Sequence, residues 1–183
     1  MNLEHGRSGF TDAAHDFRRA SWGMSKKEVM RSEGVPPLSH GEGYVTYGES
    51  VMGLDAVVGF HFRRDSLVEA GYAFREPLGG ESMYVREYAK VKGILSGSYG
   101  NPAIDEDICA GCGLCGKVCR CGDAVRSAQS LIYLTEWMTG RSVIRLVLMG
   151  EKGVFDFGLL HRSSAHALCL EGECGERPRA SCG

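Results

Sequence analysis

The sequence has no excess of either charge, and this excludes the usual class of nucleic-acid-binding proteins. Its 21 Lys and Arg face 23 Asp and Glu, which gives a formal net charge of −2. No basic run is longer than a pair such as Arg18-Arg19 or Lys26-Lys27. Because nucleic-acid recognition needs a concentrated basic surface, we expect no nucleic-acid partner and assign these pairs to solvated surface.

Long apolar runs are also missing. No stretch approaches the roughly 18 apolar residues of a membrane-spanning helix, so we expect no membrane span. Residues 1–17 (MNLEHGRSGFTDAAHDF) contain no apolar core of the kind that a secretory signal needs. The chain is therefore expected to be cytoplasmic, unless a leader has been removed.

The common catalytic signatures are absent as well. The sequence contains no G-x-S-x-G, no Walker A sequence and no H-E-x-x-H. Since no nucleophile and base form a recognisable pattern, we expect no catalytic residues and no enzyme activity. His161 and His166 lie near the C-terminal cysteines, but we interpret them as part of a solvated loop rather than as metal ligands. The acidic run Asp105-Glu106-Asp107 is interpreted in the same way.

What the sequence does contain is a normal apolar content and much glycine. Hydrophobic residues make up 43% of the 183 residues, enough to bury the core of one ordinary domain. The 26 glycines are about twice the usual share. This excess favours tight turns and therefore β structure.

Two helices and six strands are predicted from the residue pattern. Ser25 and Glu28 have the spacing of a capping box, and Gly34 ends the helix that they begin. A second helix follows from the apolar stripe Tyr84, Tyr88, Val91 and Leu95. Alternating or continuous apolar runs predict strands at residues 44–48, 56–62, 67–74, 130–138, 142–150 and 154–161.

This order predicts an α+β fold made of two α-β-β-β repeats, with helices packed on an antiparallel sheet. The expected organisation is an N-terminal extension at 1–16, a repeated domain at 17–164 and a cysteine-containing tail at 165–183. A cysteine-rich insertion at 105–123 interrupts the second repeat.

Six stretches of the chain are shared with other proteins: 22–29 (WGMSKKEV), 53–62 (GLDAVVGFHF), 70–74 (AGYAF), 98–102 (SYGNP), 136–150 (EWMTGRSVIRLVLMG) and 163–164. In these stretches the chain resembles a group of uncharacterised bacterial proteins. Their fold is similar to that of the β-lactamase inhibitory protein and of small outer-membrane assembly lipoproteins. The resemblance covers most of residues 17–164 and implies a repeated α+β scaffold that binds partners through its sheet. In that group the link after the Tyr-Gly-x-Pro turn is short and has no cysteines.

Five of the eight cysteines lie within residues 109–121. Four of them, Cys109, Cys112, Cys115 and Cys119, have the spacing C-x2-C-x2-C-x3-C of bacterial ferredoxins that hold [4Fe–4S] clusters. A tight loop of this kind turns thiolates toward one cavity, and Gly111 and Gly113 tolerate the backbone conformations that it needs. Residues 107–125 (DICAGCGLCGKVCRCGDAV) thus resemble a ferredoxin-type cluster motif.

The fourth ligand has several candidates. The proline that follows the fourth cysteine in the ferredoxin pattern is Arg120 here, and the chain has no second cysteine run to build another cluster. The fourth thiolate is then Cys119 or Cys121, or one of the tail cysteines: Cys169, Cys174 and Cys182. Cys119 is favoured because it closes the shortest loop.

Zinc is the competing ligand for the same segment. Cys109, Cys112, Cys119 and Cys121 could form a tetrahedral all-thiolate site, or the thiols could hold no metal. The first functional hypothesis is a small iron–sulfur protein for electron transfer or redox sensing, with a redox partner protein. The alternative is a non-catalytic protein-binding scaffold whose cysteine segment binds structural zinc or no metal.

Overall fold

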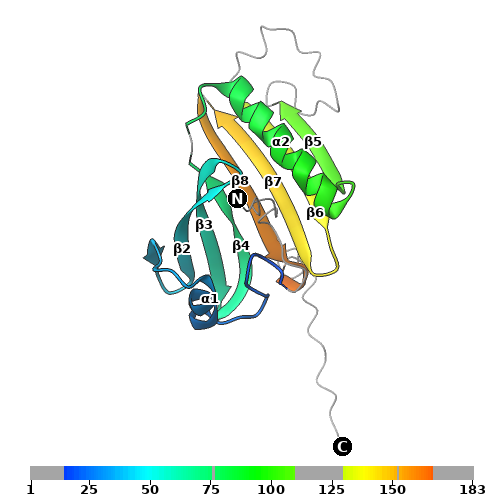
Figure 1. Cartoon of the computed structure of the whole chain (residues 1–183). Helices are drawn as coiled ribbons and strands as arrows, with labels where there is room; N and C mark the ends of the chain where they lie inside the picture. Colours follow the sequence, from blue (N-terminus) through cyan, green and yellow to red (C-terminus); the bar gives the residue numbers. More distant parts are fainter. Residues whose placement is uncertain (1–14, 76, 110–129, 152, 167–183) are drawn as a thin grey trace, which may run out of the picture.

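In a computed structural model of the chain, the described residues form one antiparallel sheet and two complete helices (Figure 1). The structure describes residues 15–75, 77–109, 130–151 and 153–166. The order of the strands across the sheet is β1-β2-β3-β4-β8-β7-β6-β5. The helices are α1 (Lys26–Glu33) and α2 (Glu81–Tyr99). The strands are β1 (Ser39–His40), β2 (Tyr44–Val51), β3 (Leu54–Arg63), β4 (Ser66–Phe74), β5 (Ile104–Cys109), β6 (Ser130–Met138), β7 (Ser142–Glu151) and β8 (Val154–Ser163).

The predicted α+β class with two α-β-β-β repeats is wrong. All eight strands belong to a single sheet, and this sheet dominates the described structure. Each half of the sheet has four strands rather than three, β1–β4 in one half and β5–β8 in the other, and α1 has only eight residues.

The two strands that the residue pattern missed lie at the two edges of the sheet. β1 has two residues, too few for any alternation to be visible. β5 contains Asp105, Glu106 and Asp107, residue types that are depleted in strands. Charged side chains are nevertheless common on edge strands, where they discourage pairing with other molecules. Residues 105–109 therefore belong to the sheet, and the predicted insertion at 105–123 begins too early.

The predicted start and end of the first helix are confirmed. Ser25 Oγ accepts a hydrogen bond from the Glu28 backbone N–H at 3.3 Å, and the Glu28 carboxylate accepts one from the Ser25 backbone N–H at 2.8 Å. Gly34 ends α1 with a left-handed φ of 71°. The β3–β4 hairpin turns at Arg64 and Asp65, both with positive φ, as a two-residue turn of the primed type requires.

The β4–β8 pair is the seam between the two halves of the sheet. Glu69 lies opposite Arg162, and Gly71 lies opposite Leu160. A Cβ atom at position 71 would lie 2.4 Å from the Leu159 carbonyl oxygen, closer than real contacts allow. Glycine at this position therefore permits the close approach of the two backbones.

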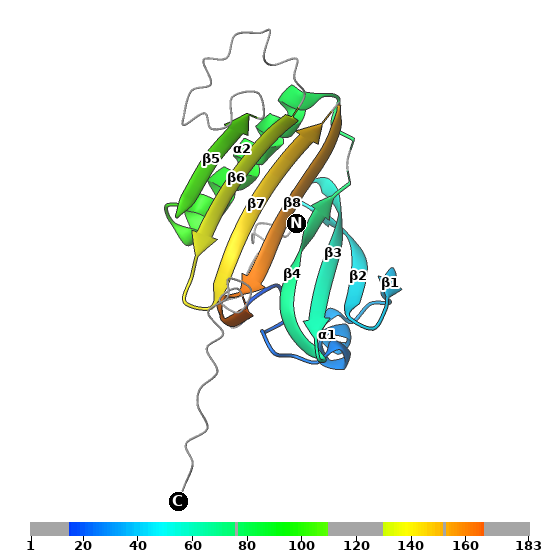
Figure 2. The same cartoon turned by 180° about the vertical axis from the view of Figure 1, so that it is seen from behind.

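One face of the sheet carries the core. α2 lies on the strands of the C-terminal half, where Tyr88 contacts Tyr133 and Phe157 (Figure 1). Residues 15–24, which we call the N-terminal strap, cover the same face, because Phe17 of the strap and Tyr99 of α2 both contact His161. On the opposite face, the described residues place no helix over β5–β8 (Figure 2).

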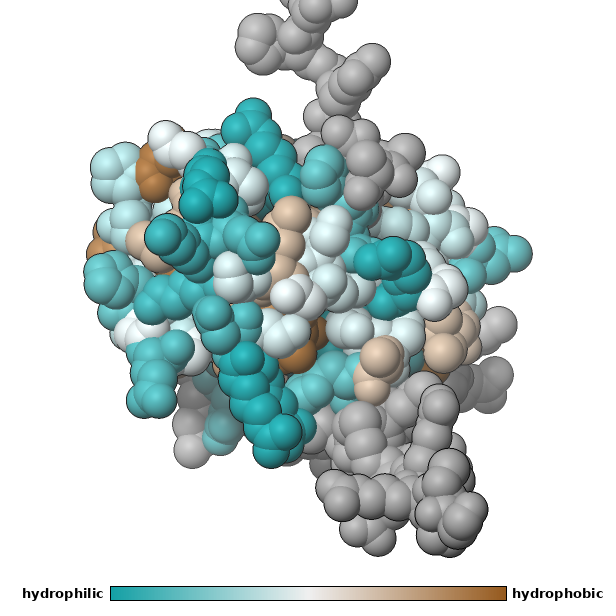
Figure 3. All heavy atoms as spheres, turned by 90° about the horizontal axis from the view of Figure 1, so that it is seen from below, coloured by the Kyte–Doolittle hydropathy of each residue, from teal (hydrophilic) through white to brown (hydrophobic). Residues whose placement is uncertain are grey.

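The end of the molecule that carries α1 is mainly hydrophilic. Seen from below, it shows hydrophobic residues only singly among polar ones (Figure 3). In the described part of the chain, no helix combines the length and the apolar character needed to cross a membrane.

Candidate functional site

Of the residues predicted to bind a cluster, the structure places one. Cys109 is the last residue of β5, and its backbone is paired with that of Leu131 in β6. The other predicted ligands and loop glycines lie outside the described residues, as do the alternative ligands. These are Gly111, Cys112, Gly113, Cys115, Cys119, Cys121, Cys169, Cys174 and Cys182.

The cysteine motif occupies the link between two strands that are hydrogen-bonded neighbours. β5 and β6 pair antiparallel from Ile104↔Glu136 to Cys109↔Leu131. A hairpin of this kind can be closed by two to five residues. Residues 110–129 join the two strands here, and four more cysteines lie within that link. The sheet itself does not require a link of this length.

A chain of hydrogen bonds fixes β5 against α2. The Thr135 hydroxyl donates to Asp105 Oδ1 at 3.1 Å, and the Tyr88 and Thr135 hydroxyl oxygens are 2.6 Å apart. Since the Thr135 hydroxyl has one proton, Tyr88 is the donor in the second bond. Lys92 of α2 completes the arrangement with an ion pair to Asp105 Oδ1 at 2.5 Å.

Asp105 is therefore not the freely solvated loop carboxylate that the sequence suggested. Its side chain is 44% exposed, but its carboxylate connects an edge strand to a helix and to a fully buried threonine. Two polar contacts thus hold β5 four residues before Cys109. The anchored strand gives the cysteine segment a defined starting point.

Metal binding within the described residues is a separate question. No group of three or more His, Cys, Asp or Glu side chains that could hold a metal ion is found there. The prediction of a metal site thus depends on the motif that begins at Cys109.

His161 is another predicted residue whose position differs from expectation. It lies in β8 and is completely buried, not in a solvated loop. Phe157, Leu159 and His161 alternate along the strand and are all buried. The alternation of Phe157, Leu159 and His161 is visible in the sequence and indicates a buried position for His161. The polar residues that follow it favoured a loop instead.

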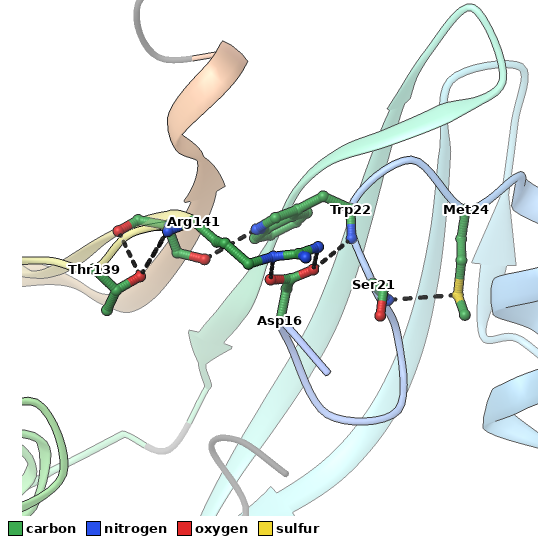
Figure 4. A network of polar contacts seen from close by, with 7 residues as sticks. Asp16, Ser21, Trp22, Met24, Thr139 and Arg141 are labelled. Carbon is green, nitrogen blue, oxygen red and sulfur yellow. Dashed lines mark hydrogen bonds and ion pairs between the residues drawn. The ribbon is translucent and has the colours of Figure 1, made fainter. Parts of the chain in front are cut away.

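The N-terminal strap is tied to the turn between β6 and β7 (Figure 4). Asp16 accepts two hydrogen bonds from Arg141, both at 2.7 Å, and a third from the Trp22 backbone N–H at 2.9 Å. The Trp22 indole N–H donates to Ser142 Oγ at 2.9 Å. Residue 16, predicted to belong to an extension, is thus part of the ordered strap.

A second polar cluster lies where the strap meets α1 and β2. The Arg18 guanidinium lies 3.0 Å from both the Glu33 and Glu49 carboxylates, and its side chain is 22% exposed. Arg18 was expected on solvated surface and is instead a partly buried ion-pair residue with φ of 54°. Burial raises the pKa of nearby Tyr72 to about 12, although the positive charge of Arg18 opposes this rise.

Comparisons with protein-family models, with curated proteins and with solved structures found no match to the chain.

Proposed function

We propose that the protein carries a [4Fe–4S]-type cluster on the segment that begins at Cys109 and uses it for electron transfer or redox sensing. Cys109, Cys112 and Cys115 would supply three thiolates, and Cys119 the fourth. Gly111 and Gly113 would allow the loop to turn tightly between these ligands. The cluster supplies one-electron chemistry, and the chain supplies the thiolates and their orientation.

The observation that carries this proposal is the combination of motif and position. The spacing C-x2-C-x2-C-x3-C falls in a link of residues 110–129 that joins two adjacent antiparallel strands. Because a few residues would close this hairpin, the length and the cysteines need a reason other than the fold. Cluster binding provides one reason for both.

The alternative function is a non-catalytic protein-binding scaffold, whose cysteine segment would bind structural zinc or no metal. The observation that favours this alternative is the sheet face opposite α2, where the described residues place no helix over β5–β8 (Figure 2). Met149 on this face is 45% exposed. The half-buried neighbours on the same face are Ile132, Leu134, Val143, Val147 and Leu160.

Anaerobic purification followed by measurement of iron, acid-labile sulfide and zinc separates the two functions. The cluster proposal expects brown protein with iron and sulfide in similar amounts. Colourless protein with stoichiometric zinc, or with no metal after attempted reconstitution, supports the scaffold instead.

Serine variants then identify the ligands. Cys112→Ser should abolish the cluster, because it removes a central ligand of the motif. Cys119→Ser should leave a labile or three-iron cluster, which electron paramagnetic resonance detects. A normal four-iron spectrum for Cys119→Ser, together with loss of the cluster in Cys121→Ser, Cys169→Ser or Cys174→Ser, would show that another cysteine is the fourth ligand.

A further inference from the structure

His161 is an ionisable side chain buried at the seam of the sheet with no polar partner. It is fully buried, and neither ring nitrogen makes a hydrogen bond. Its backbone is paired with Ala70 of β4 on one side and with Ile144 of β7 on the other. Both of these neighbours are apolar. A buried imidazole without a partner is stable only in its uncharged form.

Two elements, the strap and α2, cover the His161 imidazole on the core face of the sheet. The ring of Phe17 in the N-terminal strap lies 5.0 Å from that of His161, with an edge-on geometry. The ring of Tyr99, the last residue of α2, lies 6.3 Å away. The strap is thus one of the two lids over His161, and the other is the end of a 19-residue helix.

The charged groups near this site are engaged elsewhere. Asp16 and Arg18 flank Phe17, but Asp16 binds Arg141, and Arg18 binds Glu33 and Glu49. From α2 and β4 the titratable groups are the phenols of Tyr99 and Tyr72, which are uncharged in acid. On β8 itself, Arg162 is paired with Glu69 of β4. No carboxylate among the described residues is hydrogen-bonded to His161 to compensate a charge on its ring.

The strap is the cover that costs least to remove. Apart from the local turn of residues 17–20, polar bonds hold it at three places: the β6–β7 turn, the start of β4 and the cluster around Arg18. At β4, the Gly23 N–H donates to the Leu67 carbonyl at 3.0 Å, and the Leu67 N–H donates to the Met24 carbonyl at 2.8 Å. The other surroundings of His161 are strands and a helix, each held by a full ladder of backbone hydrogen bonds.

We propose that residues 15–24 form an acid-released strap. When His161 takes up a proton, its charge can be solvated only if Phe17 moves away, so protonation favours the state in which the strap is detached from the sheet. The proton binds to a ring nitrogen that has no hydrogen bond to lose. This is a conformational device of the scaffold, and it does not depend on metal binding by the cysteine segment.

The direction and size of the effect follow from proton linkage. Burial lowers the pKa of His161 to about 3 in the closed state, whereas an exposed histidine has a pKa near 6.5. The closed state is therefore favoured fully above pH 6.5, and this advantage is lost as the pH falls toward 3. Between pH 7.5 and pH 5.0 the ratio of open to closed strap should rise about 30-fold.

Hydrogen exchange of the full-length protein measures this ratio directly. The reporters, called here the strap amides, are the backbone N–H groups of Gly23 and Leu67, which donate across the contact between strap and β4 to the Leu67 and Met24 carbonyls. Their protection factors, corrected for the intrinsic pH dependence of exchange, should fall about 30-fold between pH 7.5 and pH 5.0. This range lies above the pH at which carboxylates ordinarily titrate.

Three variants separate His161 from other causes. His161→Leu and His161→Gln remove the titrating group, and whichever folds better should show a pH change of less than about threefold. His15→Gln removes the imidazole that belongs to the strap itself and should retain the full effect. The proposal is overturned if the protection factors of the strap amides in the natural sequence do not change with pH. It is also overturned if the change persists in the His161 variants.

Discussion

At the scale of single residues, the most consequential polar group is the hydroxyl of Thr135. It lies between the buried phenol of Tyr88 and the carboxylate of Asp105, and it is fully buried itself. Its hydrogen bonds connect α2, β6 and β5. Because buried polar groups lose water when the chain folds, each depends on its partner in the protein.

Thr135→Val should therefore destabilise the protein by about 1–3 kcal/mol, since it keeps the shape of the side chain but removes the hydroxyl that Tyr88 and Asp105 use. Urea unfolding followed by circular dichroism measures the change. Thr46→Val is the matched control, because its 3.3 Å bond to the Ser39 carbonyl is exposed, and it should change stability by less than about 0.5 kcal/mol.

Tyr88→Phe completes a double-mutant cycle with Thr135→Val. If the two hydroxyls interact directly, the double variant should be less destabilised than the sum of the single variants, by about 0.5 kcal/mol or more. Strict additivity would mean that the 2.6 Å contact contributes nothing to stability.

At the scale of elements, α1 could be predicted from the sequence and the edge strands could not. The capping box of Ser25 and Glu28 and the glycine at position 34 are local signals, and α1 begins and ends where they place it. β5 is set by its pairing with β6, which overrides the low strand propensity of its three carboxylates. The candidate site shows the same difference between local and distant signals. The cysteine spacing could be read from the sequence. The contacts of Asp105 with Lys92 and Thr135 could not, because they depend on how α2 and β6 pack against β5.

Glycine-to-alanine substitutions should stabilise the protein inside α2 and destabilise it at the end of α1. Gly93 and Gly97 are exposed in α2, and no atom lies within 4 Å of a Cβ built at either position. Gly93→Ala and Gly97→Ala should each stabilise the protein by about 0.5–1 kcal/mol. Gly34→Ala should destabilise it by about 1 kcal/mol, because φ there is 71°. Thermal unfolding of the three variants gives the sign, and a destabilising Gly93→Ala would contradict the geometry of α2.

At the scale of the whole molecule, the described residues on both sides of the link 110–129 share one buried core. The fully buried aromatic and aliphatic side chains belong to the strap, α1, α2 and the strands on both sides of that link. Trp137 is among them and donates its indole N–H to the Gly100 carbonyl at 3.1 Å. The buried core of the described residues thus lies on both sides of the link that carries the cysteine motif.

Replacing residues 110–129 by Gly-Asn-Gly should leave a single cooperative thermal transition. Cys109 and Leu131 remain paired, and a loop of this length closes an antiparallel hairpin. Replacing residues 105–123 should give a lower melting temperature than replacing residues 110–129, because it removes most of β5 and the contacts of Asp105. Differential scanning calorimetry compares the two. Loss of cooperativity when residues 110–129 are replaced would mean that the link contributes to the core.

The seam between β4 and β8 also constrains the order in which the protein can assemble. The paired residues Glu69 and Arg162 are 93 positions apart, and every strand of the C-terminal half is made after β4. On the ribosome, β4 must therefore wait with one side of its backbone unpaired until β8 has emerged. An exposed strand edge is a template for pairing with other chains. Nascent chains that pause within this interval are the form of the protein most exposed to aggregation.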